Sequence, residues 1–350
     1  MFLSLYTALS YMASAVLPDI FTSIVVIILA LFLSVDLSPL LYIFLSLIFL
    51  LAVMVHYSHF LIILMMWGGF FLFSILKRFQ KHPLKISLRR WVITGVLVVI
   101  PWILLPTIHQ KMGYGFAMSR ATHMFFVAKM METGVMKKFL DEFCPTSPYS
   151  LCESKEIQVA AFLFSPVANQ GGGWEARKEE YDRLRQHVLK TPRYFLYFLE
   201  SMGRSILVAL SDNIIEPYFP FKKTERVPQQ VEKFFYSRDI SNYLQSKQAG
   251  GWKGYDFTRW SENHKTVVSF SLIVLVIYLF ASFKMRGVDK SLEVFVSITL
   301  LGVFSNALVC GSLTAFNAHR LMARIWWLLP LCVILMVTSL EKKEVRTEPS

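Results

Sequence analysis

The chain has 350 residues, a formal net charge of +12 and a 55% share of hydrophobic residues. Soluble domains average about 45–50% apolar residues, and here the excess is gathered in long blocks, so the composition excludes an ordinary soluble protein. The basic residues are spread over loops, and the sequence has no basic–aromatic motif for nucleic acid. The charge therefore indicates anionic lipid, and not nucleic acid, as a partner.

Four apolar runs lie within residues 1–108, which we expect to form an N-terminal membrane bundle. A helix needs about 20 residues to cross the hydrocarbon core. Residues 1–17 are also apolar, but they lack the basic region and cleavage site of a secretory signal, so an interfacial or partly inserted helix is expected there. The expected spans lie near 20–35, 39–55, 60–76 and 91–108.

A long polar stretch, residues 109–265, separates this bundle from a C-terminal bundle of three apolar runs at 266–340. The three runs lie near 266–283, 291–311 and 323–340, and residues 341–350 form a polar tail. We therefore predict an all-α polytopic membrane protein with about seven transmembrane helices. A mainly helical outer domain, 109–265, is expected between spans four and five.

Short basic segments indicate which side of the membrane is cytoplasmic. Residues 77–90 carry six Lys and Arg and no acid, and the basic segment 284–290 and the tail 341–350 fall on the same side if every span crosses once. Loops of this kind stay cytoplasmic. We therefore expect 77–90 and the C-terminus in the cytoplasm and 109–265 outside, in the periplasm or the extracellular space.

Apolar and charged patterns predict the elements of the outer domain. Residues 124–143 have apolar residues at helical spacing, and 160–167 read as a buried or strand-like segment. A charged helix is expected over 175–190 and an apolar, aromatic helix over 193–211. Cys144 and Cys152 close a loop rich in proline and serine, and an oxidising compartment would favour a disulfide between them over two free thiols.

Asp19 is one of only two acids in the first 131 residues, and it stands directly before an apolar run. An Asp at this position is typical of a helix N-cap, where its side chain accepts from free backbone N–H groups. The alternative is a general base at the outer end of the span, and the two roles do not exclude each other.

His56 and His59 are three residues apart, so they share one face if that segment is helical. The spacing suits a metal pair, and the cofactor that it suggests is a divalent metal. Two histidines alone do not make a site, and interface histidines without a special role are the alternative.

Two basic motifs are candidates for binding a phosphate group. Arg120 and His123 precede the helix expected over 124–143, and His319, Arg320 and Arg324 open the last apolar run. An arginine offers a planar fork of donors that matches phosphate oxygens. Arg324 lies one turn into the apolar run, so it must reach the interface, pair with an acid such as Asp19, or face a polar cavity.

Five stretches of the sequence carry a resemblance to a known family: LPDIFTS (17–23), HYSH (56–59), SRATHMFFVAKMMETG (119–134), CPTSPYSLC (144–152) and HRLMARIWWLLP (319–330). Together they resemble a family of uncharacterised polytopic inner-membrane proteins of bacteria, and the resemblance runs along most of the chain. More distantly, the layout is similar to GT-C-type glycosyltransferases, which place a carboxylate at the outer end of an early span and basic residues on outer loops that bind a polyprenyl-phosphate sugar donor. The resemblance implies a multi-pass protein of the bacterial cytoplasmic membrane.

Two interpretations stay open, from different classes of function. In the first, the protein is a transferase that acts on a lipid-linked substrate at the outer face, with Asp19 as the base and the basic residues as phosphate ligands. In the second, it is a non-catalytic membrane subunit whose outer domain docks a partner protein. A transporter is a weaker third hypothesis, because charges well inside the apolar runs are scarce and transport pathways usually carry them.

Overall fold

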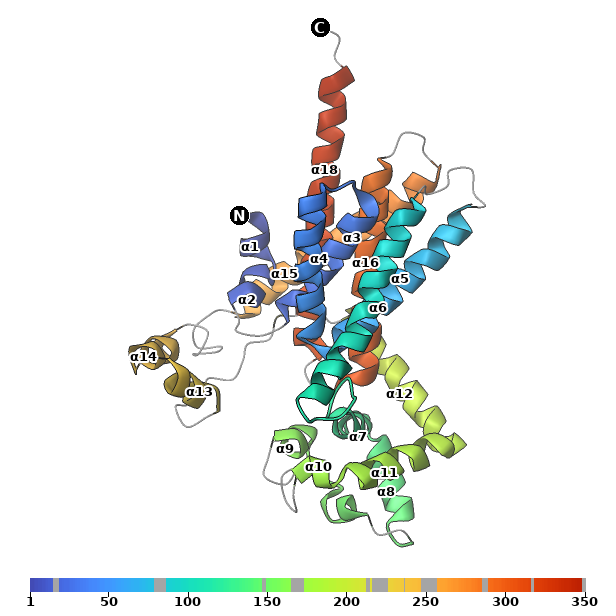
Figure 1. The fold of residues 1–350 in the computed structure, drawn as a ribbon, viewed down its shortest axis with the longest axis vertical. Helices are drawn as coiled ribbons and strands as arrows, with labels where there is room; N and C mark the ends of the chain where they lie inside the picture. Colours follow the sequence, from blue (N-terminus) through green and yellow to red (C-terminus); the bar gives the residue numbers. More distant parts are fainter. Residues whose placement is uncertain are drawn as a thin grey trace.

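A computed structural model of the chain describes residues 1–14, 19–78, 86–146, 149–164, 173–211, 215, 226–235, 237–246, 257–284, 289–315 and 318–347. Every regular element in these ranges is helical (Figure 1). The helices of the bundle are α3 (Ile20–Ser34), α4 (Pro39–Met54), α5 (Tyr57–Arg78), α6 (Leu88–Lys111), α15 (Phe257–Lys284), α16 (Lys290–Leu313), α17 (Ala318–Trp326) and α18 (Leu328–Thr347).

Five stretches of the bundle are long and apolar enough to cross a membrane. They lie in α5, α6, α15, α16 and the α17–α18 pair. The other two expected spans form α3 and α4, which have 15 and 16 residues and so fall short of the roughly 20 that a perpendicular crossing needs. The described chain therefore fits an integral membrane protein with five candidate spans, and the expectation of seven stays a prediction.

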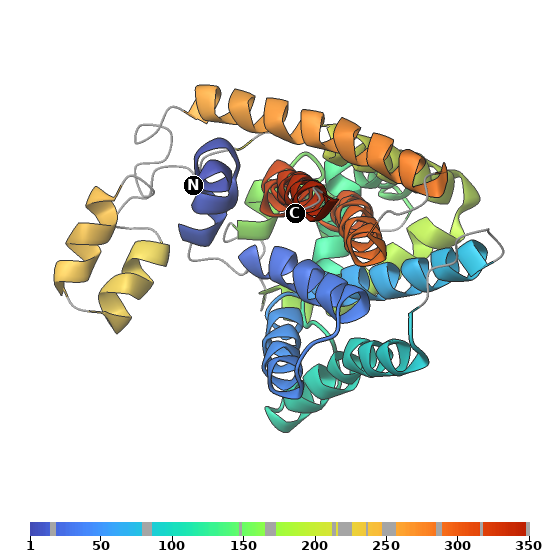
Figure 2. The ribbon, with the colours of Figure 1, turned by 90° about the horizontal axis from the view of Figure 1, so that it is seen from above.

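Helix α16 occupies the middle of the bundle, where it packs on α3, on α5 and on α12 (Pro192–Ser211). Two glycines allow these close approaches. A Cβ atom at Gly302 would lie 2.9 Å from Val26, and one at Gly311 would lie 2.7 Å from the backbone of Ile206 in α12. Small residues bring helices together in membranes because they let backbones approach closely. Seen from above, α18 is viewed nearly end-on, while α15 is seen lengthwise and runs beside it (Figure 2).

A second hydrophobic cluster lies beyond the lower end of the bundle in Figure 1 and is built by α7–α12. The helix expected over 124–143 is two helices, α7 (Thr122–Glu132) and α8 (Val135–Phe143). The break falls at Gly134, whose φ of 73° is the left-handed conformation that glycine adopts without strain. The apolar segment expected as strand-like or buried begins with the helix α9 (Val159–Phe164), and residues 165–167 lie outside the described ranges.

The charged and aromatic segments of this region form the helices that their patterns predict. Residues 175–190 are covered by α10 (Gly173–Ala176) and α11 (Lys178–Lys190), and the predicted apolar helix is α12. Helix α11 buries Tyr181, Leu184 and Val188 along one stripe and exposes charged side chains elsewhere. This stripe has the spacing of an amphipathic helix on a core.

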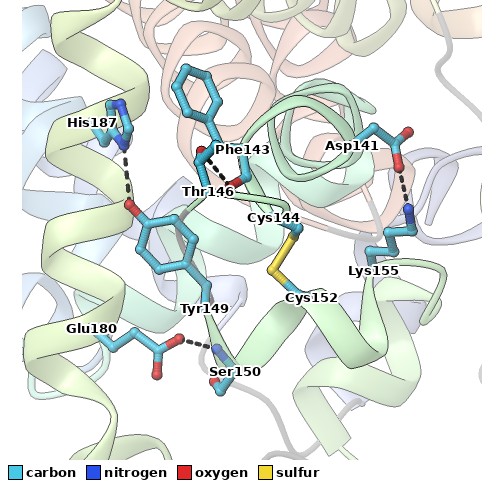
Figure 3. Close-up of a disulfide and its surroundings, with 10 residues drawn as sticks. All are labelled: Asp141, Phe143, Cys144, Thr146, Tyr149, Ser150, Cys152, Lys155, Glu180 and His187. Atoms are coloured by element: carbon cyan, nitrogen blue, oxygen red, sulfur yellow. Dashed lines mark hydrogen bonds and ion pairs between the residues drawn. A yellow bond between two sulfur atoms is a disulfide. The ribbon is translucent and has the colours of Figure 1, made fainter.

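The predicted disulfide between Cys144 and Cys152 is present, with 5.8 Å between the two Cα atoms (Figure 3). It joins the end of α8 to the short 3₁₀ helix η1 (Ser150–Ser154). Hydrogen bonds hold the same loop on α11: Tyr149 Oη lies 3.0 Å from His187 Nδ1, and the backbone N–H of Ser150 donates to Glu180 at 2.6 Å.

The remaining elements are short. Helices α1 (Phe2–Tyr6) and α2 (Leu9–Ser14) lie beside the bundle, where Tyr11 packs on Phe257 and Trp260 of α15. Helices α13 (Arg226–Phe234) and α14 (Ser237–Gln245) pack on each other and stand apart from the bundle in both views.

Candidate functional site

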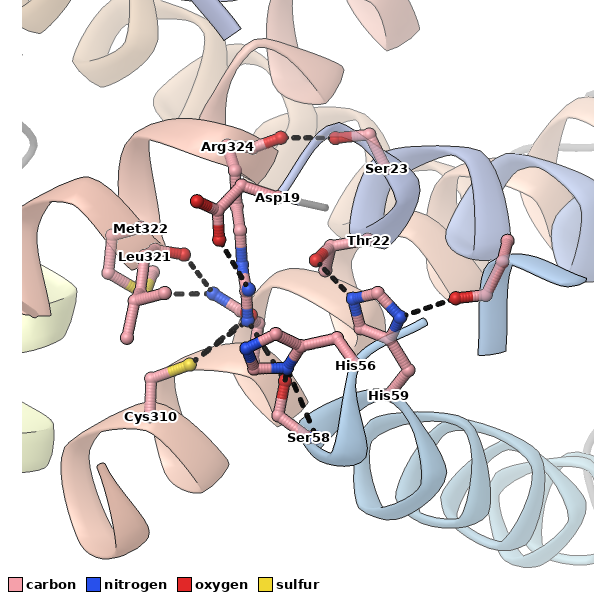
Figure 4. Close-up of polar contacts among 12 residues, drawn as sticks. Asp19, Thr22, Ser23, His56, Ser58, His59, Cys310, Leu321, Met322 and Arg324 are labelled. Carbon is pink, nitrogen blue, oxygen red and sulfur yellow. Dashed lines mark hydrogen bonds and ion pairs between the residues drawn. The ribbon is translucent and has the colours of Figure 1, made fainter. Parts of the chain in front are cut away.

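Arg324 of α17 is the largest fully buried side chain of the described chain. A guanidinium is always charged and carries five N–H donors, so its burial is costly unless acceptors surround it. Three other segments supply those acceptors, namely the N-terminal ends of α3 and α5 and the C-terminal half of α16 (Figure 4). The last apolar run therefore begins with a charge that is enclosed by protein.

Asp19 neutralises Arg324, as the sequence predicts in one of its alternatives. Arg324 Nη1 donates to Asp19 Oδ1 at 3.1 Å, and both side chains are buried. Asp19 occupies the N-cap position of α3, but its side chain makes no capping hydrogen bond. The position of the cap was thus predicted correctly, while the carboxylate is directed to the arginine.

The second terminal nitrogen of Arg324 contacts three more side chains. Its Nη2 lies 2.8 Å from Asn306 Oδ1, 3.3 Å from Cys310 Sγ and 3.3 Å from Ser58 Oγ. Asn306 is held in turn, because its Nδ2 donates to the carbonyl of Leu321 at 2.9 Å. Among the described residues, Arg324 Nε has no hydrogen-bond partner. The cluster therefore satisfies most, and not all, of the donors of the buried cation.

Asn306, Cys310 and Ser58 belong to the cluster although the sequence patterns did not predict them as site residues. Asn306 and Cys310 are four residues apart in α16 and so share one helical face. An asparagine within an apolar run is a signal that could have found them, because polar side chains inside spans usually have partners there.

The histidine pair lies at the edge of this cluster. His59 Nδ1 donates to the carbonyl of Ala52 at 2.6 Å, and His59 Nε2 lies 2.7 Å from Thr22 Oγ1. A carbonyl can only accept, so the Nδ1 atom carries the proton and the Nε2 lone pair of a neutral ring is taken by Thr22. His56 Nδ1 lies 2.7 Å from Ser58 Oγ.

These bonds bear on the predicted metal pair. A metal ion at His59 would have to displace Thr22 from Nε2, because Nδ1 is bound to the carbonyl of Ala52. No group of three or more His, Cys, Asp or Glu side chains suited to a metal occurs within the described ranges. The geometry therefore favours a hydrogen-bonding role for both histidines.

Arg120 and His123 lie in a different place, below the bundle at the start of α7. They line a polar pocket of about 230 Å³ together with Tyr114, Glu175 and Lys178. Arg120 forms an ion pair with Glu175, and its guanidinium lies 4.4 Å from the centre of the Tyr114 ring. The structure thus separates this basic pair from Asp19 and Arg324 and does not gather all the predicted ligands in one site.

An apolar pocket of about 200 Å³ adjoins the polar one, and Ser119 lines both. Its walls come from α5, α6, α7 and the end of α16, and they are largely aromatic. They include Tyr57, Phe60, Trp102, Phe125, Phe126 and Leu313. The Tyr57 ring stacks on both Phe125 and His56, so this pocket borders the enclosed cluster.

Two predicted ligands cannot be placed. The backbone of α17 includes His319 and Arg320, but their side chains lie outside the described residues.

Comparisons with known proteins leave the site to be interpreted from its geometry alone. No family model, no curated protein and no solved structure matches the chain. The resemblance to bacterial inner-membrane proteins and to GT-C-type glycosyltransferases therefore remains an expectation drawn from sequence patterns.

Proposed function

We propose that this protein is an integral membrane protein that binds an amphiphilic lipid phosphate where its bundle meets α7–α12. The observation that carries the proposal is the pair of adjoining pockets, one apolar and one basic, that share Ser119. A ligand that fills both must carry a hydrocarbon chain and an anionic head. Membrane phospholipids and polyprenyl phosphates share this chemistry.

The apolar pocket suits the chain end of such a ligand. Tyr57, Phe60, Trp102 and Phe125 give it aromatic walls at the ends of two candidate spans, α5 and α6. Binding pockets for small molecules are commonly lined by apolar and aromatic side chains with a few polar groups at one end. Here the polar groups line the adjoining basic pocket, on the other side of Ser119.

The basic pocket suits the phosphate. Arg120 offers a bidentate fork, and Lys178 is the first residue of α11, where the helix dipole also favours an anion. Glu175 competes for Arg120 and reduces the positive charge. Removing that carboxylate should therefore strengthen the binding of a phosphate.

Asp19 has no part in this binding step. Its carboxylate is enclosed with Arg324 and is not available to accept a proton from an acceptor hydroxyl. The proposal therefore assigns lipid binding and no group transfer. The catalytic role of Asp19 stays a prediction, and it requires a conformation in which Arg324 releases the carboxylate.

Native mass spectrometry of the purified full chain tests the proposal. The probes are a long-chain polyprenyl phosphate, phosphatidylglycerol, the uncharged polyprenol and inorganic phosphate. The two lipids that carry a phosphate should bind, the polyprenol should bind more weakly, and inorganic phosphate should not bind measurably. The lipid that binds more tightly shows whether the ligand is a polyprenyl phosphate or a membrane phospholipid. Binding of inorganic phosphate alone would show a free-anion site and overturn the proposal.

Variants locate the binding at the two pockets. Arg120→Gln with Lys178→Gln should weaken the phosphate-bearing lipids by about tenfold or more, since each charge-assisted bond contributes about 1.5–3 kcal/mol. Glu175→Gln should strengthen them. Lys190→Gln, at the other end of α11, is the matched control. Equal affinities for the double variant and the control would contradict the proposal.

A further inference from the structure

A second apolar groove extends along α6 from Leu88 to Ile103 and shares no lining residue with the pockets of the proposed lipid site. It runs between α5 and α6 and has a volume of about 500 Å³. Trp67 and Phe71 of α5 form one wall, and Leu88, Trp91 and Val96 of α6 form the other. Both helices are candidate spans, so the groove opens on the surface that faces lipid.

The aromatic wall of the groove is held in place. Trp67 Nε1 donates to Thr94 Oγ1 at 3.0 Å, and the Trp67 ring stacks on Phe71 and meets Trp91 edge to face. Gly95 makes room for the ring, because a Cβ atom there would lie 3.0 Å from Trp67. A rigid groove of this kind holds a hydrocarbon chain with little loss of side-chain freedom.

A positive charge lies at the end of the groove. Arg89 is exposed and stands beside Leu88, which lines the groove. The nearby acid Asp36 pairs with Arg90 at 2.5 Å, so it does not neutralise Arg89. Arg89 and Arg90 are the last two of the six Lys and Arg in residues 77–90, a stretch of the sequence that has no acid. An anionic headgroup would therefore be attracted to the same end.

We propose that the α5–α6 groove is a binding site for an anionic glycerophospholipid. One acyl chain lies along Trp67 and Gly95, and the phosphate contacts Arg89. The apolar length of the groove distinguishes a lipid from a free anion, and the charge at its end distinguishes an anionic lipid from a zwitterionic one. The residues of this groove are separate from those of the proposed lipid site at the two adjoining pockets. Either proposal can therefore be contradicted without affecting the other.

The test is native mass spectrometry of the purified full chain with phosphatidylglycerol and phosphatidylcholine of matched chains. The wild type should bind phosphatidylglycerol more tightly. Arg89→Gln should reduce that affinity by about fivefold, which corresponds to about 1 kcal/mol for one basic residue at a membrane surface, and leave phosphatidylcholine unchanged. Val96→Trp, which fills the groove from its exposed side, should reduce the affinity for both lipids.

Matched controls separate this site from general effects. Val337→Trp makes the same change at an exposed position of α18, and Lys265→Gln removes a cation at the start of another candidate span. Size-exclusion profiles and melting temperatures establish that each variant is folded. The preference for phosphatidylglycerol should persist when Arg120 and Lys178 are both replaced by Gln. The proposal is overturned if Val96→Trp binds lipid like Val337→Trp, or if Arg89→Gln binds it like Lys265→Gln.

Discussion

At the scale of single residues, the Asp19–Arg324 pair joins two parts of the sequence that are 305 positions apart. A buried ion pair adds little net stability over a well-packed apolar pair, because both charges lose their hydration. Removing one partner is different, since it leaves an uncompensated charge inside the protein. The polar groups around Arg324, including Asn306 and Ser58, accept its hydrogen bonds but carry no negative charge. In this arrangement Asp19 therefore supplies the negative charge that compensates Arg324.

This leads to a prediction for Asp19→Asn. The variant should lose about 3–5 kcal/mol of stability, as buried charges do when their partner is removed. An Asn would satisfy an N-cap equally well, so a purely capping Asp19 would tolerate the change. Thermal unfolding of the purified protein in detergent measures the difference. A melting temperature equal to that of the wild type would show that the pair does not stabilise the bundle.

The double variant Asp19→Leu, Arg324→Met provides the control. It removes both charges and keeps the volume apolar, so it should recover most of the stability that Asp19→Asn loses. If the double variant is less stable than Asp19→Asn, the polar cluster contributes through its hydrogen bonds and not through charge compensation.

A second prediction at this scale concerns Asp141 beside the disulfide. A hydrogen bond from Lys155 and the charge of Lys137 lower the pKa of Asp141 below its ordinary value of 3.8. A group whose pKa is lower in the folded state stabilises the protein above its unfolded pKa and loses that contribution as the pH falls. Asp141→Asn should therefore lower the melting temperature at pH 7 and have a progressively smaller effect as the pH falls below 3.8. If Asp141→Asn changes the melting temperature by the same amount at neutral and at acidic pH, the prediction is wrong.

At the scale of elements, a disulfide joins the end of α8 to η1, and a hydrogen bond joins the loop between them to α11 (Figure 3). The Cys144–Cys152 bridge closes a short loop, so it removes only a modest part of the entropy of the unfolded chain. Its effect should be local to α7–α12, because the candidate spans pack in a separate cluster.

Replacing both cysteines by Ser should therefore destabilise the α7–α12 region by about 2–3 kcal/mol. Hydrogen exchange should become faster in α8 and in residues 149–158 while the exchange of α16 is unchanged. The matched control is Cys332→Ser in the bundle, which should leave α8 unaffected. Uniformly faster exchange in both regions would show that they unfold as one unit.

Helix α12 links the two regions. Its buried side carries Tyr194 and Phe198 into the α7–α11 core, and Ile206 lies against Gly311 of α16. Its other side exposes Leu196, Leu199 and Leu207. These apolar side chains keep open the hypothesis of a subunit that docks a partner protein.

At the scale of the whole molecule, the two ends of the bundle differ in what lies beside them. The helix ends that flank the basic segments lie at the end where α18 finishes, and α7–α12 lie at the other (Figure 1). This arrangement agrees with a sided membrane protein. Which end faces the cytoplasm is a prediction from the basic loops alone.

Cysteine labelling of intact cells tests that orientation. A membrane-impermeant thiol reagent should label Ser246→Cys and should not label Ser87→Cys until the cells are permeabilised. Cys310 and Cys332 are buried and Cys144 and Cys152 are bridged, so the background should be low. Labelling of Ser87→Cys alone in intact cells would reverse the topology.

The sequence by itself determined the class of the protein, the approximate positions of its helices and the disulfide. These are local properties: an apolar run of spanning length needs a membrane, and two cysteines in a short turn-rich loop lie close in any fold. The same local patterns predicted a single helix over 124–143, because periodicity does not show that Gly134 takes a left-handed conformation that ends one helix before the next begins.

Only the tertiary structure decided which polar residues meet. Asp19 and Arg324 are 305 positions apart, and their pairing depends on how α3, α5, α16 and α17 pack together. The same packing encloses the pair, removes it from any open site, and leaves Arg120 beside an aromatic pocket that no spacing in the sequence indicates. Burial and long-range contact depend on the sum of many packing energies, and no short stretch of sequence contains that sum.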